Sequence, residues 1–123
     1  MTSLIFLLST FACTTGANYP EKFASAYCET AYKCMNNNDI ETFTGYDDVE
    51  DCKVEWTTEL MNSSDYEAWE EGDMAFDREN ANICLTEIIE VQQDSDCDGA
   101  MNVFDFFNDT QSNACADVYY TTE

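Results

Sequence analysis

Apolar side chains recur with a helical period over most of this chain. Tyr27, Ala31 and Met35 are spaced four residues apart, and they follow Pro20, a residue suited to the first turn of a helix. The polar run at 36–39 ends this pattern. The spacing therefore predicts a helix from Pro20 to Met35 with one face turned toward a core.

A second helix is predicted after Asp47. Val49, Cys52, Trp56 and Leu60 form one stripe at helical spacing. The segment opens with acidic residues, which the positive end of the helix dipole favours.

Two further helices are predicted in the second half of the chain. Capping-box spacing between Ser64 and Glu67 predicts a short helix at 66–71. Asp77 can cap a longer helix that continues to Gln92. The inner face of this longer helix is apolar and consists of Ala81, Cys84, Leu85, Ile88 and Val91.

The tail offers two short segments, at 103–108 and 114–120, that we also expect to be helical. One proline and four glycines are too few for a turn-rich β-sandwich or a loop-dominated knottin. We therefore predict an all-α fold: a small, disulfide-stapled bundle of about four helices. A single domain at 18–123 follows an N-terminal export signal at 1–17.

The first residues resemble a signal segment. The apolar run at 4–8 is much shorter than the about 20 residues that span a bilayer. The sequence TFAC at 10–13 resembles a bacterial lipobox, in which Cys13 becomes the lipidated first residue of the mature protein. Two alternatives stay open: ordinary signal cleavage after Ala17, and an uncleaved N-terminus that is buried or membrane-associated.

Charge narrows the range of partners. The chain has 26 acidic and four basic residues and a net charge of −22. Such a surface repels nucleic acid and anionic lipid headgroups, because both are bound through Lys and Arg. We therefore expect no nucleic-acid partner, and we expect membrane association to come from a lipid anchor. An acidic, solvated surface adapted to salt is the plainer interpretation of the charge.

The seven cysteines indicate an exported protein. If Cys13 is lipidated or removed, six remain for three disulfides, which indicate an oxidising compartment. Cys28 and Cys34 lie about 120° apart around one helix and should not pair with each other. The sequence spacings then favour the pairs Cys34–Cys52, Cys28–Cys84 and Cys97–Cys115. The absence of histidine and of a C-x-x-C pair disfavours zinc and redox sites.

One segment carries a pattern with chemical meaning. Residues 94–105 resemble the EF-hand calcium loop, with glycine at its sixth position, Gly99. Calcium prefers six to eight oxygen ligands, and this spacing places oxygens around one centre. The candidate ligands, at loop positions 1, 3, 5, 7, 9 and 12, are Asp94, Asp96, Asp98, Ala100, Asn102 and Asp105.

A second interpretation of this loop stays open. Asp105 is one methylene shorter than the usual Glu, and the chain shows no second loop of the kind with which EF-hands pair. Cys97 would also bring a disulfide into the loop. The alternative is a disulfide-closed acidic turn at Asp98-Gly99 that binds no metal.

The functional expectation is a non-catalytic, exported protein. The chain has no histidine for acid–base work and none of the common nucleophile or phosphate-loop motifs. The lipobox-like Cys13, followed by FASAYCETAYKC and ANICLTEII, is similar to small cysteine-rich lipoproteins of Gram-negative bacteria. That resemblance implies a lipid-anchored protein of the cell envelope, and Thr14 after the cysteine implies the outer membrane or cell surface.

A different class of protein also fits these residues. A secreted, soluble signalling or toxin-like protein would share the cysteines and the export signal. It would begin at Asn18 and be extracellular. The sequons at Asn62 and Asn108 would matter only if the source were eukaryotic.

Overall fold

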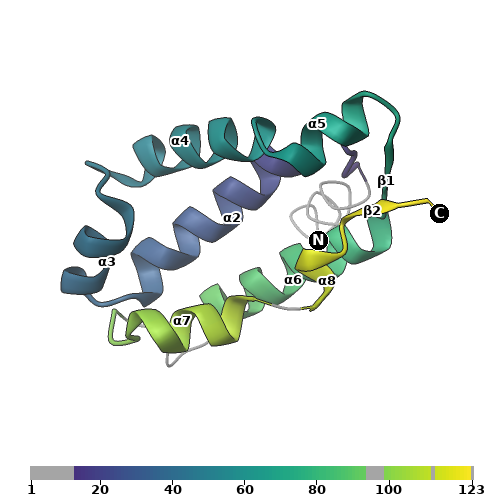
Figure 1. The fold of residues 1–123 in the computed structure, drawn as a ribbon. Coiled ribbons are helices and arrows are strands. Elements are labelled where there is room, and N and C mark those ends of the chain that lie inside the picture. Colours follow the sequence, from purple (N-terminus) through teal and green to yellow (C-terminus); the bar gives the residue numbers. More distant parts are fainter. Residues whose placement is uncertain (1–12, 94–98, 112, 123) are drawn as a thin grey trace.

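The computed structural model describes residues 13–93, 99–111 and 113–122, and within them the fold is mostly helical (Figure 1). Seven helices and one two-stranded sheet occur in these described ranges. The helices are α2 (Tyr19–Cys34), α3 (Asn37–Thr44), α4 (Val49–Met61), α5 (Ser64–Glu70), α6 (Arg78–Gln93), α7 (Val103–Thr110) and α8 (Asn113–Ala116). The strands are β1 (Met74–Phe76) and β2 (Tyr119–Thr121).

Helix α2 forms the centre of the domain, between α4 on one side and α6 and α7 on the other (Figure 1). Tyr27 is 1% exposed, and its ring packs on rings from three helices. The ring centroids lie 5.3 Å from Phe23 on α2, 5.4 Å from Trp56 on α4 and 5.2 Å from Phe106 on α7. The sequence-predicted apolar face of this helix is therefore the core of the fold.

The predicted starts of the longer helices are confirmed within a few residues. Asp48 caps α4 by accepting a hydrogen bond from the Asp51 backbone N–H at 2.8 Å. Asp77 caps α6 through the Asn80 N–H at 2.9 Å. Ser63, one residue before the predicted cap, caps α5. Short polar side chains at these positions satisfy backbone donors that a helix leaves unpaired.

Helix α3 was not predicted. The polar run after Met35 ends α2 and at once begins another helix, because the Asn36 side chain accepts a hydrogen bond from the Asp39 N–H at 2.9 Å. Gly45 ends α3 in the left-handed region, with φ of 64°. A run of asparagines therefore serves both as a stop and as a start.

The C-terminal tail differs from the prediction of a helix at 114–120. Only Asn113–Ala116 is helical, and Tyr119–Thr121 pairs antiparallel with Met74–Phe76. The Asp77 N–H extends this pairing by donating to the Val118 carbonyl at 2.7 Å. Aromatic and β-branched residues favour a strand wherever a partner strand is within reach, and here β1 supplies one.

The disulfide pairs differ from all three that the sequence spacings favoured. Cys28 is bonded to Cys52, with 6.0 Å between the Cα atoms, and Cys84 is bonded to Cys115, at 4.8 Å. The pairs Cys34–Cys52, Cys28–Cys84 and Cys97–Cys115 are therefore wrong. Cys34 is also disulfide-bonded, and Cys97 lies outside the described residues.

The undetected helix α3 explains the first error. It carries the chain beyond the end of α2, so α4 returns alongside the middle of α2 and brings Cys52 opposite Cys28 (Figure 1). The second error comes from the direction of α6. Cys84 Sγ accepts a hydrogen bond from the Tyr19 hydroxyl at 3.4 Å and is bonded to Cys115, so it faces the first residue of α2 and the C-terminal segment.

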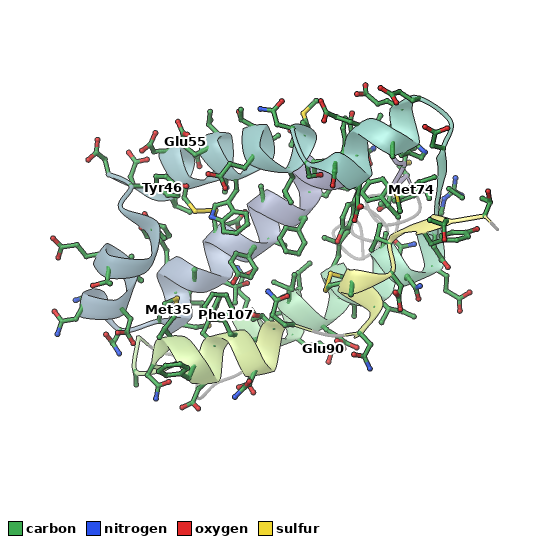
Figure 2. All side chains as sticks on the ribbon, in the orientation of Figure 1. Met35, Tyr46, Glu55, Met74, Glu90 and Phe107 are labelled. Carbon is green, nitrogen blue, oxygen red and sulfur yellow. A yellow bond between two sulfur atoms is a disulfide. The ribbon has the colours of Figure 1, made fainter. Side chains whose placement is uncertain are left out.

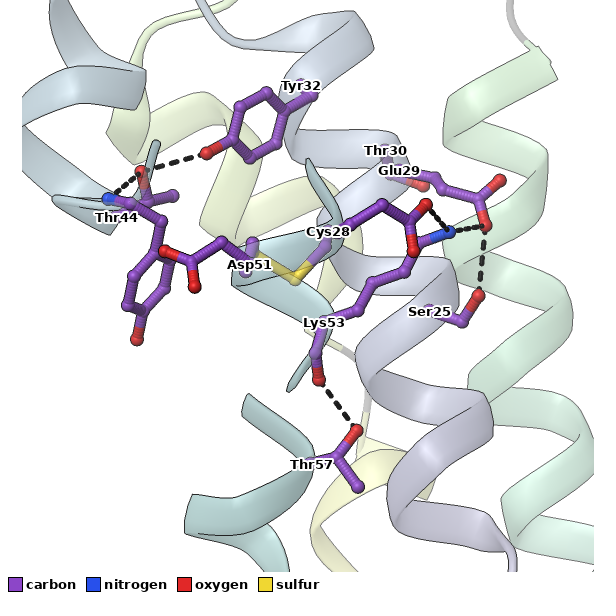
Figure 3. The surroundings of a disulfide bond; sticks show 12 residues. Ser25, Cys28, Glu29, Thr30, Tyr32, Thr44, Asp51, Lys53 and Thr57 are labelled. Carbon is purple, nitrogen blue, oxygen red and sulfur yellow. Dashed lines mark hydrogen bonds and ion pairs between the residues drawn. A yellow bond between two sulfur atoms is a disulfide. The ribbon is translucent and has the colours of Figure 1, made fainter. Parts of the chain in front are cut away.

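The Cys28–Cys52 disulfide is flanked by charged side chains (Figure 3). Lys53 forms ion pairs with Glu29 at 3.0 Å and with Glu50 at 3.4 Å. Partial burial acts to lower the pKa of Lys53, but the two carboxylates outweigh it and raise that pKa above its usual value. Lys53, one of only four basic residues in the chain, thus links α4 to α2 next to the Cys28–Cys52 disulfide.

Carboxylates cover the outside of the bundle. Figure 2 shows Glu55 on α4 and Glu90 on α6 on opposite outer faces, while Met35 and Phe107 lie between α2 and α7. None of the described helices has the length and hydropathy of a membrane span. The described core is largely aromatic, and the described acidic side chains lie outside it.

Peptide mapping of the oxidised protein tests the pairing. Combined cleavage after Lys and Glu separates Cys28, Cys34 and Cys52 into different peptides. We expect the peptide that contains Cys28 to be linked to the one that contains Cys52. A link from Cys34 to Cys52 would contradict this fold.

Replacing both Cys28 and Cys52 by alanine should lower the free energy of unfolding by about 3 kcal/mol, measured by urea denaturation.

Candidate functional site

An N-terminal arm, defined here as residues 13–18, is folded onto the domain. Cys13 is exposed and its thiol is free, whereas the next residue, Thr14, is fully buried. Thr15 and Asn18 cap each other, since each backbone N–H donates to the other side chain, at 2.7 and 3.2 Å. The Asn18 amide also donates to the Cys13 carbonyl at 2.9 Å. These bonds fix the path of the chain immediately after Cys13.

Gly16 joins the arm to the domain through two contacts. The Tyr119 hydroxyl on β2 donates to the Gly16 carbonyl at 2.8 Å. A Cβ atom at this position would overlap the indole ring of Trp69 on α5, so the ring packs directly on the glycine backbone. Burial, and secondarily Tyr66, raises the pKa of Tyr119 well above its ordinary value, so the hydroxyl keeps the proton that it donates.

The two rings that contact the arm, Trp69 and Tyr119, pack on a third ring, that of Tyr66. The centroid of Tyr119 lies 6.1 Å from Tyr66 and 6.1 Å from Trp69. These rings come from α5 and β2, so the arm is held by the part of the fold that the C-terminal strand completes. The sequence pattern predicts a domain that begins at residue 18, whereas the structure extends the folded part to the arm. The signal for this docking was Gly16, one of only four glycines.

The described part of the candidate calcium loop, residues 99–105, lies at the opposite end of the bundle (Figure 1). Helix α6 ends at Gln93 and α7 begins at Val103, so the loop connects two helices as the sequence pattern requires. Asp94, Asp96 and Asp98 lie outside the described residues. In the part of the chain that is described, no group of three or more acidic or cysteine side chains could hold a metal ion.

The described half of the loop has defined geometry. Gly99 has a φ of 74°, which glycine adopts without strain, and Ala100 is exposed. Asn102 caps α7 by accepting from the Asp105 N–H at 2.9 Å. The Asn102 amide in turn donates to the Asp105 carboxylate at 3.1 Å. Of the candidate ligands, Asn102 and Asp105 are thus brought together at the start of α7.

A side chain from α3 also reaches this end of the loop. The Asp39 carboxylate accepts the Val103 backbone N–H at 2.8 Å and the Asn36 amide at 2.9 Å. Met35 and Met101 form a parallel β-bridge, in which the Asn36 N–H donates to Met101 at 2.9 Å. Asp39 therefore caps α7 from another helix, at the end where the helix dipole favours negative charge.

These contacts join two copies of one short pattern. The sequence Met-Asn-x-x-Asp occurs at 35–39 and at 101–105, and each copy begins a helix of eight residues after a helix of 16. The two copies agree at only three positions, so the repeat is weak in the sequence. The matching cap at each asparagine, followed by aspartate three residues later, was the detectable signal.

A cleft of about 290 Å³ lies beside the start of α2. Its walls are mainly aromatic and aliphatic, and among its described residues the only carboxylate is that of Asp65. The cleft offers apolar contact and no pair of acidic groups that could act as proton donor and acceptor.

Comparison with known proteins gives no relative for this chain: no family model, curated protein or solved structure matches it.

The substitution Gly16→Val tests the docked arm. A valine side chain would overlap the indole of Trp69, so we expect the free energy of unfolding to fall by about 1–3 kcal/mol in urea denaturation. Ala17→Val is the matched control, because Ala17 is exposed and its variant should keep the stability of the parent protein. Equal stability of the two variants would show that the arm is not docked.

Proposed function

We propose that this protein is an exported, non-catalytic lipoprotein of the cell envelope, anchored through a lipid on Cys13. The acidic helical domain is the part that faces water. The disulfides Cys28–Cys52 and Cys84–Cys115 are consistent with this proposal, because such bonds persist in oxidising compartments outside the cytosol.

The docking of Gly16 and Thr14 is the observation that carries the proposal. Cleavage after Ala17 would remove the carbonyl that accepts from Tyr119 and would uncover the face of Trp69 that packs on Gly16. Cleavage before Cys13 would keep every one of these contacts. Of the two processing sites, the lipobox-like one therefore agrees with the packing of the arm, and Cys13 is exposed as a lipid-bearing residue must be.

We further propose that the loop at 94–105 binds calcium weakly. Three features support this: the helices that flank the loop, the left-handed Gly99, and the position of Asn102 and Asp105 at the start of α7. Calcium sites of extracellular modules bind the ion with dissociation constants of about 10⁻⁴–10⁻³ M. Bound calcium would also relieve part of the repulsion among the carboxylates of this chain.

Intact mass of the protein extracted from membranes tests the anchor. We expect a chain that begins at Cys13 and carries a diacylglycerol on the sulfur. The Cys13→Ser variant should lose the lipid and appear in the soluble fraction, while its far-ultraviolet circular dichroism stays unchanged because Cys13 is exposed and free.

A mature chain that begins at Asn18 would contradict the lipoprotein proposal. It would favour the alternative, a secreted, soluble signalling or toxin-like protein. A soluble chain that begins at Asn18 would also lack residues 13–17 of the arm, so its stability would show how much these residues contribute.

Thermal melting with and without calcium tests the loop. A site with a dissociation constant of about 10⁻⁴ M, at roughly 10 mM calcium, would stabilise the domain by about 2.7 kcal/mol. Asp94→Ala should abolish this gain. Asp109→Ala removes an exposed carboxylate from α7 outside the loop. This variant should keep the stabilisation by calcium. An equal gain in both variants would indicate general screening of negative charge and would exclude the site.

A further inference from the structure

The arm leaves almost no linker between Cys13 and the domain. Cys13 is exposed, the adjacent Thr14 is fully buried, and the Cys13 carbonyl is held by the Asn18 amide at 2.9 Å. A lipid on Cys13 would therefore be attached to a fixed point of the fold. The position of that point decides which end of the molecule lies next to the membrane.

The fixed point belongs to one end of the bundle. Gly16 contacts Trp69 of α5 and Tyr119 of β2, and β2 pairs with β1. Figure 1 shows α5, β1 and β2 gathered at this end, with α3 and the start of α7 at the other. We call the first group the anchor end and the second the loop end.

We propose that the docked arm sets the orientation of the domain on the membrane, with the anchor end on the bilayer surface and the loop end directed away from it. This inference rests on the proposed lipid at Cys13. The surface that the anchor end contacts is a lipid bilayer. The short connection to Cys13 prevents the domain from rotating to present its other end to that bilayer.

The side chains at the anchor end limit the kind of surface that fits. Tyr120 on β2 is 43% exposed, and an exposed tyrosine suits the polar–apolar boundary of a bilayer. Glu70, Glu71 and Asp73 are also exposed there and would be repelled by anionic headgroups. The expected surface is therefore one of zwitterionic lipid.

Trp69 is a native reporter for this orientation. It packs on the arm, whereas Trp56 packs on Tyr27 in the middle of the bundle. Tyr27 lies about 12 Å along α2 from Tyr19, the residue whose ring contacts Tyr119 at the anchor end. The variant Trp56→Phe leaves Trp69 as the single source of tryptophan fluorescence.

The experiment uses the lipidated Trp56→Phe protein in phosphatidylcholine vesicles that contain a headgroup nitroxide, a quencher of short range. We expect strong quenching of Trp69. A six-residue Gly-Ser insertion between Cys13 and Thr14 adds a tether of about 14 Å while residues 14–18 stay docked, and the quenching should fall. Adding Phe104→Trp to the variant without the insertion places an indole at the loop end, where Phe104 is 77% exposed, and should add an unquenched component.

Two outcomes would overturn the orientation. One is quenching of Trp69 that the insertion does not change, and the other is equal quenching of both indoles in the variant with Phe104→Trp. Mass spectrometry of the same samples keeps this test separate from the test of the anchor. A chain without lipid would contradict the proposed function, whereas a lipidated chain with either outcome would contradict only the orientation.

Discussion

The burial of the Tyr27 ring is the contact on which the arrangement of the helices depends. Rings from α2, α4 and α7 meet it within about 5.4 Å, so one side chain fixes the spacing of three helices. The covalent links then act around this core. Cys28–Cys52 holds α4 against α2, and Cys84–Cys115 ties the C-terminal segment to α6. A chain with a net charge of −22 gains little from its few ion pairs, so aromatic contact and disulfides oppose its self-repulsion.

The sequence was informative wherever a local rule decided the structure. Asp48, Ser63 and Asp77 begin helices because a short polar side chain satisfies backbone donors within the same turn. The apolar stripe through Tyr27 and Ala31 identified the buried face of α2 for the same reason, since helical spacing needs no knowledge of the partner.

Local rules failed where two distant segments decide the result. One failure was itself local: Asn36 caps α3 through the Asp39 N–H within one turn, but the polar run at 36–39 predicts only the end of α2. Because α3 was not predicted, the expected position of α4 along α2 was wrong. The predicted partner of Cys28 was therefore wrong as well. Tyr119 became part of a strand because β1 was available. In the candidate sites, the pattern at 94–105 could be read from spacing, whereas the roles of Gly16 and Asp39 depend on Trp69 and Val103, which are remote in sequence.

The bond between the Tyr119 hydroxyl and the Gly16 carbonyl joins residues 103 positions apart, and this separation has a consequence for biogenesis. A chain exported from its N-terminus brings Cys13 across the membrane long before Tyr119 follows. If the protein is exported as proposed, Gly16 cannot form this bond until β2 has crossed the membrane, so Cys13 would meet the processing enzymes on an open chain. Docking of the arm would then follow the proposed modification of the cysteine. In the proposed export route, the order of synthesis itself keeps the modification site accessible for the time in which it is needed.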